Sequence, residues 1–242
     1  PTAVRRIALN TGGGDAPGLN AVIRAVTLGA LDREWEVLGI RDGYDGLFGE
    51  HSHGEGVMLL GRDDVRDITH MGGTMLGTTN RGNPFQVGRG PDVAQRLREL
   101  EIDVLVAVGG DGSLNIAHQI SLEGIPTIGV PKTIDNDLEH TDLTTGFDSA
   151  VAFATECIDR LVSTTTAHGR VMVIEVMGRT AGWIALHADI AAAAHAILIP
   201  EIPYDISVVA DRVKERADRG QDFSIVVVAE GATPIGGTVT TV

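Results

Sequence analysis

Short apolar runs alternate with amphipathic stretches along the chain. The apolar runs predict buried strands at Arg6–Asn10, Trp35–Ile40, Asp103–Val108, Ile125–Val130, Val171–Val176, Ala196–Ile199 and Phe223–Ala229. The stretches between them predict helices at Leu19–Asp32, Pro91–Leu100, Ser113–Leu122, Phe147–Ser163, Thr180–Ala194 and Ser207–Arg219. Apolar strands separated by helices are typical of a mostly parallel sheet covered on both faces. The pattern therefore predicts an α/β fold.

A polar stretch from Leu138 to Thr145 interrupts this alternation. Such a stretch suits a crossing between two lobes. We therefore expect one lobe over residues 1–138 and a second over residues 139–242. A chain of 242 residues, 43% of them hydrophobic, is long enough for two such lobes.

Composition and charge narrow the class of protein. The net charge of −14 argues against binding to nucleic acid or to an anionic membrane. No apolar run reaches the roughly 18–20 residues of a membrane span, and we expect no secretory signal. The single cysteine, Cys157, lies in an apolar helical stretch and is interpreted as an inert thiol. A cytoplasmic protein is expected.

Polar or glycine-rich loops follow five of the predicted strands. They are Thr11–Gly18, Gly109–Ser113, Pro131–Asp137, Met177–Arg179 and Glu230–Gly231. In open parallel sheets, ligands bind beyond the carboxyl ends of the strands. We therefore expect the five loops to meet at one crevice.

The first loop, Thr11–Gly18, combines several glycines with a following helix, which suits an anion at the helix N-terminus. It is not a dinucleotide fingerprint, because Pro17 stands where a glycine is needed. It is not a P-loop either, because the chain contains no Gly-Lys pair. A tight strand-to-helix turn remains an alternative interpretation.

The next two loops carry carboxylates. Asp111 lies between glycines that let backbone amides approach phosphate oxygens, and its carboxylate suits Mg²⁺; an Asx-type turn is the alternative. Asp135 and Asp137, two residues apart, could divide the work of a general base, and an acidic surface loop is the alternative.

Arginine and histidine side chains near these loops are further candidates. Arg81, Arg170 and Arg179 could clamp phosphate through their guanidinium groups, although a single arginine is more often a solvated surface residue. His168 has no recognisable partner in the sequence and is interpreted as structural.

Four of these segments together resemble the signature blocks of the 6-phosphofructokinases. The blocks are Gly13–Arg24, Gly109–Ser113, Pro131–Asp137 and Glu175–Arg179, and they follow the order found in that family. The resemblance runs from the first strand to Glu230. It implies two Rossmann-like lobes, a donor lobe and a sugar-phosphate lobe, and transfer of a phosphoryl group to fructose 6-phosphate in glycolysis.

The resemblance also implies a role for each matching residue. Asp135 would accept the proton of the sugar 1-hydroxyl, with Thr133, Asp137 and Lys132 beside it. The donor and its Mg²⁺ would lie against Gly13, Tyr44, Arg81, Gly110, Asp111, Gly112 and Ser113, with Asp111 holding the metal. The sugar phosphate would lie against Thr133, Asp135, Met177, Gly178, Arg179 and Glu230. Arg170 would reach the sugar phosphate of a neighbouring subunit, which implies a homodimer or homotetramer.

Two residues indicate different donors. Gly112 resembles the ATP-dependent members of the family, because an aspartate there would place charge and bulk against the nucleotide. Lys132 resembles the members that use pyrophosphate, but a lysine does not exclude a nucleotide. We favour ATP, with pyrophosphate as the alternative.

Members of the family continue beyond the residue that matches Val242, so we expect a truncated chain with exposed apolar area and weak or no activity of its own. A non-catalytic sugar-phosphate-binding subunit is another reading, although Asp111 and Asp135 are both retained. A dinucleotide-dependent oxidoreductase would suit the alternation of strands and helices but fails at Pro17.

Overall fold

The computed structural model describes residues 4–49, 55–80 and 83–238. The chain forms two compact units: Pro1–Thr133 with Leu138–Gly146, and Ile134–Asp137 with Phe147–Val242. The polar stretch Leu138–Thr145, expected as the crossing between two lobes, belongs wholly to the first unit, whereas Ile134–Asp137 just before it belongs to the second. That one unit serves the donor and the other the sugar phosphate stays a prediction.

The first unit is built on one sheet with the strand order β3-β2-β1-β4-β5-β6. Its strands are β1 (Arg6–Thr11), β2 (Glu36–Ile40), β3 (Val57–Leu59), β4 (Val104–Gly109), β5 (Thr127–Thr133) and β6 (Thr145–Gly146). Its helices are α1 (Leu19–Leu31), the 3₁₀ helix η1 (Asp45–Phe48), α2 (Gly90–Glu99) and α3 (Asp111–Leu122). All the pairings are parallel except that of β3 with β2.

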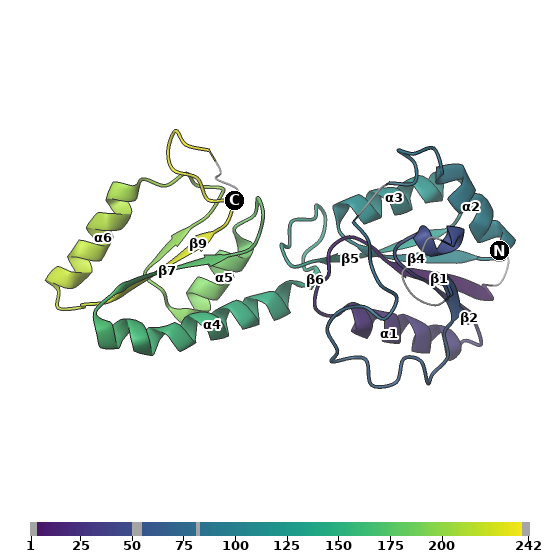
Figure 1. The fold of residues 1–242 in the computed structure, drawn as a ribbon, viewed down its shortest axis with the longest axis horizontal. Helices are drawn as coiled ribbons and strands as arrows, with labels where there is room; N and C mark the ends of the chain where they lie inside the picture. Colours follow the sequence, from purple (N-terminus) through teal and green to yellow (C-terminus); the bar gives the residue numbers. More distant parts are fainter. Residues whose placement is uncertain (1–3, 50–54, 81–82, 239–242) are drawn as a thin grey trace. The chain divides into compact units, whose positions relative to one another are not determined.

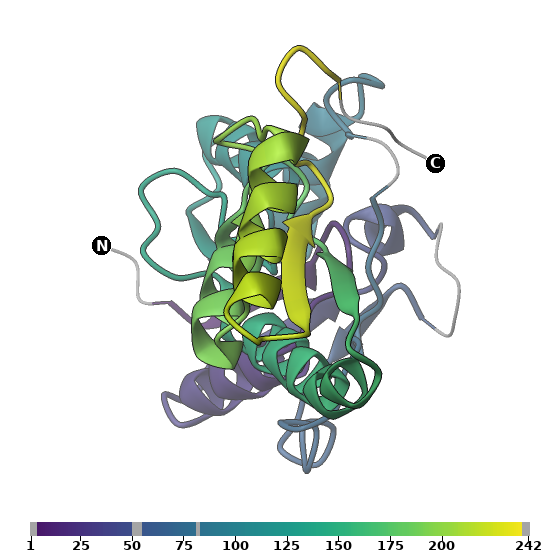
Figure 2. The ribbon, with the colours of Figure 1, turned by 90° about the vertical axis from the view of Figure 1, so that its left-hand side faces the viewer.

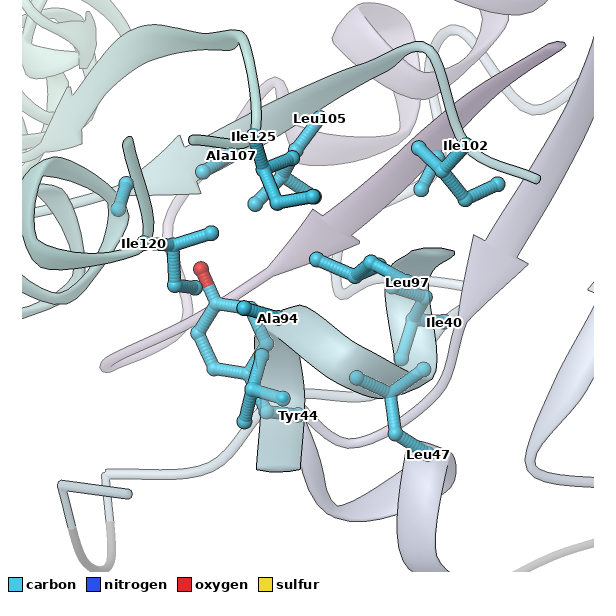
Figure 3. Close-up of a cluster of buried hydrophobic side chains, with 13 residues drawn as sticks. Ile40, Tyr44, Leu47, Ala94, Leu97, Ile102, Leu105, Ala107, Ile120 and Ile125 are labelled. Carbon is cyan, nitrogen blue, oxygen red and sulfur yellow. The ribbon is translucent and has the colours of Figure 1, made fainter. Parts of the chain in front are cut away.

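Successive side chains of a strand point to opposite faces of its sheet, and this sheet has a core on each face. On one face Ala8 packs with residues of α2, α3 and η1, as Figure 3 shows for Tyr44, Leu97 and Ile120. On the other face Ile7 and Leu9 pack with residues of α1. Figure 1 shows the same layers, with α1 on one side of the sheet and α2 and α3 on the other.

The second unit contains the parallel sheet β7-β9-β8. Its elements are α4 (Phe147–His168), β7 (Val171–Val176), α5 (Trp183–Ala192), β8 (Ala196–Leu198), α6 (Ile206–Asp218) and β9 (Ser224–Ala229). Helices α4 and α5 cover one face, where Ile158, Ala185 and Val227 are fully buried.

The opposite face of this second sheet is only partly covered. Helix α6 lies there, and Arg216 donates hydrogen bonds to the Ser224 hydroxyl and the Phe223 carbonyl; Figure 2 shows α6 next to β9. Val171 and Val173 of β7 are nevertheless 50% and 62% exposed. The prediction that helices cover both faces therefore holds for the first unit and is wrong for the β7 side of the second. The predicted exposure of apolar area is confirmed.

Apolar side chains are exposed in the first unit as well. Ile128 on β5 and Leu122 at the end of α3 are 57% and 75% exposed. Pairing of β5 with β6 involves only Lys132 and Thr133, so the first half of β5 forms an open edge of the sheet.

The predicted α/β architecture is confirmed, with differences at the ends of elements. Strand β5 runs from Thr127 to Thr133 instead of from Ile125 to Val130. Helix α4 continues past Ser163 to His168, and in this extension the hydroxyls of Thr165 and Thr166 donate to backbone carbonyls one turn earlier. The short strands β3 and β6 were not predicted.

Candidate functional site

The loops that follow β1 and β4 come together at the edge of the first sheet that is formed by the carboxyl ends of its parallel strands. The Gly12 N–H donates to the Val108 carbonyl at 2.9 Å, which ties the two strand ends to each other. Ser113 of α3 packs between the loops: a Cβ at Gly12 would lie 2.7 Å from its Oγ, and a Cβ at Gly109 would lie 2.3 Å from its Cβ. Glycine is therefore needed at position 109, and a side chain at position 12 would require the Ser113 hydroxyl to move, because the first turn of α3 packs directly on this backbone.

The two helices that begin at this edge have no side-chain cap. Helix α1 begins after Gly18, which has a φ of 92°, and α3 begins after Gly110; neither residue has a side chain that could accept from the first turn. The first N–H groups of a helix have no partner within it, and the helix dipole favours negative charge there. Both helix ends therefore suit phosphate oxygens.

Lys132, the sixth residue of β5, places an ammonium group at the first loop. Its side chain is 3% exposed, and its Nζ donates to the Gly14 carbonyl. A Cβ at Gly13 would lie 3.5 Å from the same nitrogen. The predicted donor residue Gly13 and the predicted catalytic residue Lys132 are thus neighbours, and the loop carries a buried positive charge.

Asp111 and Gly112 form the start of α3 and are both exposed. Nothing lies within 4 Å of the position that a Cβ of Gly112 would take. Among the described residues there is no group of three or more His, Cys, Asp or Glu that could hold a metal by itself. The arrangement offers one carboxylate beside open space, next to the N-terminus of α3.

Tyr44 borders a shallow cavity in the same unit. The cavity is lined by Gly12, Gly43, Tyr44, Asp45, Thr79, Pro84, Ser113 and Ile116. Most of the Tyr44 ring lies in the core between Ala94 and Ile120 (Figure 3), and only 6% of the residue is exposed. Burial raises the pKa of its phenol well above the usual value. Arg81, the remaining residue predicted to contact the donor, lies outside the described residues.

The two carboxylates in the segment after β5 differ in their exposure to solvent. Asp135 is buried, at 6% exposed, whereas Asp137 is exposed. Asn136 between them has a φ of 53°, which turns the backbone at this point. Thr133, which ends β5, accepts a hydrogen bond at its carbonyl from the Thr144 hydroxyl at 2.7 Å. Of the two acids, Asp135 has the sheltered environment that a general base needs.

In the second unit, the loop after β7 is bonded to the residue after β9. Oε1 of Glu230 accepts from the N–H groups of Gly178, at 3.1 Å, and Arg179, at 2.6 Å. Gly178 has a φ of 146° and Arg179 a φ of 52°, so consecutive N–H groups converge on one oxygen. The side chains of Met177 and Arg179 are exposed. The structure thus brings these four predicted residues together.

Arg170 and His168 lie away from that loop. Arg170 precedes β7, whereas Arg179 follows its carboxyl end, and a six-residue strand is about 20 Å long. Arg170 therefore does not join Arg179 within one chain, which is compatible with the predicted contact to a neighbouring subunit. His168 is the exposed last residue of α4.

Glu201 lies at the other end of the loop after β7, and the sequence pattern did not single it out. It follows β8, and its Oε1 accepts from the Gly182 N–H at 2.8 Å, where α5 begins. The available signal was an acid directly after Pro200 at the end of an apolar strand. The five predicted loops thus belong to two sheets rather than one, and their union in a single crevice stays a prediction.

Comparisons with known proteins show the family of the chain. The family model described as Phosphofructokinase matches residues 6–242. A protein of Chloroflexus aurantiacus named ATP-dependent 6-phosphofructokinase is 49% identical, over 97% of this chain and 67% of the relative. One of Mycobacterium bovis with the same name is 50% identical, over 97% of this chain and 67% of its own. The chain thus spans about two thirds of the length of these relatives.

Solved structures match over nearly the whole chain. Phosphofructokinase from Saccharomyces cerevisiae has a TM-score of 0.87 and 32% identity, and it matches 98% of this chain with 35% of its own. A pyrophosphate-dependent phosphofructokinase from Marinobacter aquaeolei has a TM-score of 0.81 and 26% identity, over 96% of this chain and 62% of its own.

Within the described residues, no helix is both long enough and apolar enough to span a membrane.

Proposed function

The chain belongs to the phosphofructokinase family, and from this premise we propose that it transfers a phosphoryl group from ATP to the 1-hydroxyl of fructose 6-phosphate. The observation that carries the proposal is the cluster in the first unit: two uncapped helix N-termini, a buried ammonium group and the exposed Asp111 at one sheet edge. Relatives at 49% and 50% identity that are named ATP-dependent support the choice of donor.

Open space at Gly112 supports ATP in a second way. Because nothing lies within 4 Å of a Cβ there, this edge leaves room for the part of a nucleotide that lies beyond the transferred phosphate. Gly13, Gly110 and Ser113 contribute backbone and hydroxyl groups around the phosphates, and the cavity beside Tyr44 is proposed to receive the nucleoside.

In the proposed reaction, positioning and charge provide most of the catalysis. Asp135 accepts the proton of the 1-hydroxyl as its oxygen bonds to the terminal phosphorus of ATP, while the bond from that phosphorus to the bridging oxygen breaks and ADP leaves. Thr133 and Asp137 help to orient the sugar. The ammonium group of Lys132 lies beside the first loop and offsets negative charge on the phosphate being transferred.

The residues present fit an Mg²⁺ ion. Bound to a nucleotide, Mg²⁺ usually takes one or two protein carboxylates, the phosphates and water, so a lone exposed carboxylate at the start of α3 suffices. Asp111 would hold the ion, which when bound neutralises charge on the donor phosphates.

The sugar phosphate is proposed to bind at the loop after β7. Met177 and the backbone of Gly178 pack against the sugar, Glu230 accepts from a sugar hydroxyl, and the exposed guanidinium of Arg179 binds a phosphate oxygen pair. Arg170, at the other end of β7, serves the site of a neighbouring subunit, so the active form is a homodimer or homotetramer. We place the enzyme in the cytoplasm, in glycolysis.

Pyrophosphate is the second candidate donor, and the position of Lys132 favours it. The buried ammonium group of Lys132 places a positive charge at the first loop, Thr11–Gly18, where it can bind the oxygens of a donor that consists of phosphate alone. The chain also matches a pyrophosphate-dependent structure, although at only 26% identity.

Formation of fructose 1,6-bisphosphate, followed in a coupled assay with either donor, tests the proposal. Asp135→Asn is compared with Glu139→Gln, an exposed acid of the same segment, in this chain alone and in this chain joined to the remaining third of a matched relative. We expect turnover with ATP that falls about 10² to 10⁴-fold in Asp135→Asn only. Turnover with pyrophosphate but not with ATP would make pyrophosphate the donor. A completed protein that is folded yet inactive with both donors would contradict the catalytic proposal.

A further inference from the structure

Two carboxylates hold opposite ends of the loop Gly178–Gly182, which connects β7 to α5. Glu230 follows β9 and accepts from the N–H groups of Gly178 and Arg179. Glu201 follows β8 and accepts from the N–H group of Gly182. All three strands of the second sheet therefore contribute to one loop: β7 leads into it, and the residues after β9 and β8 bind it.

The backbone between these two attachments has little freedom. The Ala181 N–H donates to the Gly178 carbonyl at 2.8 Å and closes a turn. Arg179 lies inside this turn with a φ of 52°, a conformation that costs a non-glycine residue free energy unless its surroundings impose it. The turn therefore depends on its attachments.

Close packing at two glycines marks the same attachments. A Cβ at Gly231 would lie 2.0 Å from the Arg179 carbonyl oxygen, so the backbone after Glu230 lies directly against the loop. A Cβ at Gly182 would lie 2.7 Å from Oε2 of Glu201, so this carboxylate also lies directly against the backbone that it binds.

We infer that Glu201 is a positioning residue for the sugar-phosphate site. It fixes the end of the loop where α5 begins, and through the closed turn it keeps Arg179 in the left-handed conformation that directs the guanidinium. The inference rests on the proposed function as far as the ligand is concerned, but the attachment itself does not depend on it.

The chain offers a matched control in Asp205. Its side chain accepts from the Ser207 N–H at the start of α6, also at 2.8 Å, in the same unit. Glu201→Ala removes one carboxylate bond from a helix N-terminus. Asp205→Ala removes one such bond and, with it, the bond that Asp205 accepts from the Ser207 hydroxyl, so it should lower stability at least as much. Only the first bond holds the loop that carries Arg179. Glu201→Gln keeps an acceptor oxygen and should restore most of the function.

The experiment measures amide hydrogen exchange by NMR and fructose 6-phosphate binding by calorimetry in the wild-type chain and these three variants. In Glu201→Ala we expect exchange at Gly178 and Arg179, which Glu201 does not touch, to become at least about tenfold faster. We expect the dissociation constant for fructose 6-phosphate to rise roughly tenfold. Asp205→Ala should change neither, and Glu201→Gln should stay close to wild type.

Two outcomes would contradict the inference: faster exchange confined to Gly182, or equal effects of Glu201→Ala and Asp205→Ala. If the folded wild-type chain bound no fructose 6-phosphate, the proposed substrate would fail for this chain. The exchange rates at Gly178 and Arg179 would then still decide whether Glu201 positions the loop.

Discussion

At the scale of single residues, Asp189 is an acid that the fold buries without a function in the proposed reaction. It lies on α5 next to Ala185 and Ala188 and is 6% exposed. Within the described part of the chain, its Oδ1 has no hydrogen-bond partner. Burial raises the pKa of this carboxyl to about 6, because the charged form loses its hydration.

The raised pKa predicts how stability depends on pH. An exposed aspartate has a pKa of about 3.9, so the unfolded chain releases this proton at lower pH than the folded chain. Because of Asp189, the free energy of unfolding therefore falls as pH rises from about 4 to about 6. Above pH 6 it stays lowered by the full amount, since the buried carboxylate is then charged. Asp189→Asn should stabilise the protein by about 1–2 kcal/mol at pH 8 and by little at pH 4. Thermal unfolding at the two pH values measures this, and equal shifts at both would contradict it.

Single residues of the candidate site also show which features could be predicted from the sequence and which could not. The motif Pro131–Asp137 predicts that Lys132 belongs to the site, but not that its ammonium group binds the Gly14 carbonyl, 118 residues away in sequence. That contact depends on the order of β1, β4 and β5 in the sheet. In the same way, Asp135 and Asp137 look equivalent in sequence, and only tertiary packing buries one of them.

At the scale of elements, periodicity predicts long strands and helices well and short ones poorly. Strand β7 has the predicted limits, because a mostly apolar run begins directly after Arg170 and a glycine-containing loop follows it. Strands β3 and β6 have three and two residues, too few for any period to emerge, whereas the three-residue strand β8 was predicted because it lies in a continuous apolar run. Glu201 was not singled out from the sequence either, because its hydrogen bond to the Gly182 N–H depends on how the end of β8 lies relative to the start of α5.

Strand β7 also gives an element-scale prediction about association. It is an edge strand of its sheet, and Val171 and Val173 on its open face are half exposed or more. Exposed apolar edge strands favour edge-to-edge pairing between molecules. Val173→Lys should therefore reduce concentration-dependent light scattering. Val87→Lys is the control, because Val87 is an apolar residue of the first unit that is 65% exposed, and it should leave the light scattering unchanged. Equal effects of the two substitutions would contradict a role for the β7 edge in association.

At the scale of the whole molecule, the two units differ in how much core they have. The first has a core on each face of its sheet, with Leu9, Leu97 and Ile120 among its fully buried residues. The second has a single core on one face, and no residue of α6 is buried. Since buried apolar area is the main favourable contribution to folding, the second unit should be the less stable of the two.

The two tryptophans make this difference measurable. Trp35 lies in the first unit and Trp183 in the second, and the chain has no others. Trp35→Phe leaves a reporter of the second unit, and Trp183→Phe leaves a reporter of the first. Followed by fluorescence in urea, the Trp183 signal should change at a lower urea concentration than the Trp35 signal, with far-ultraviolet circular dichroism falling across both ranges. If both tryptophan signals and the circular dichroism instead changed at the same urea concentration, the two units would unfold together as one cooperative body. The prediction that the second unit is the less stable one would then be contradicted.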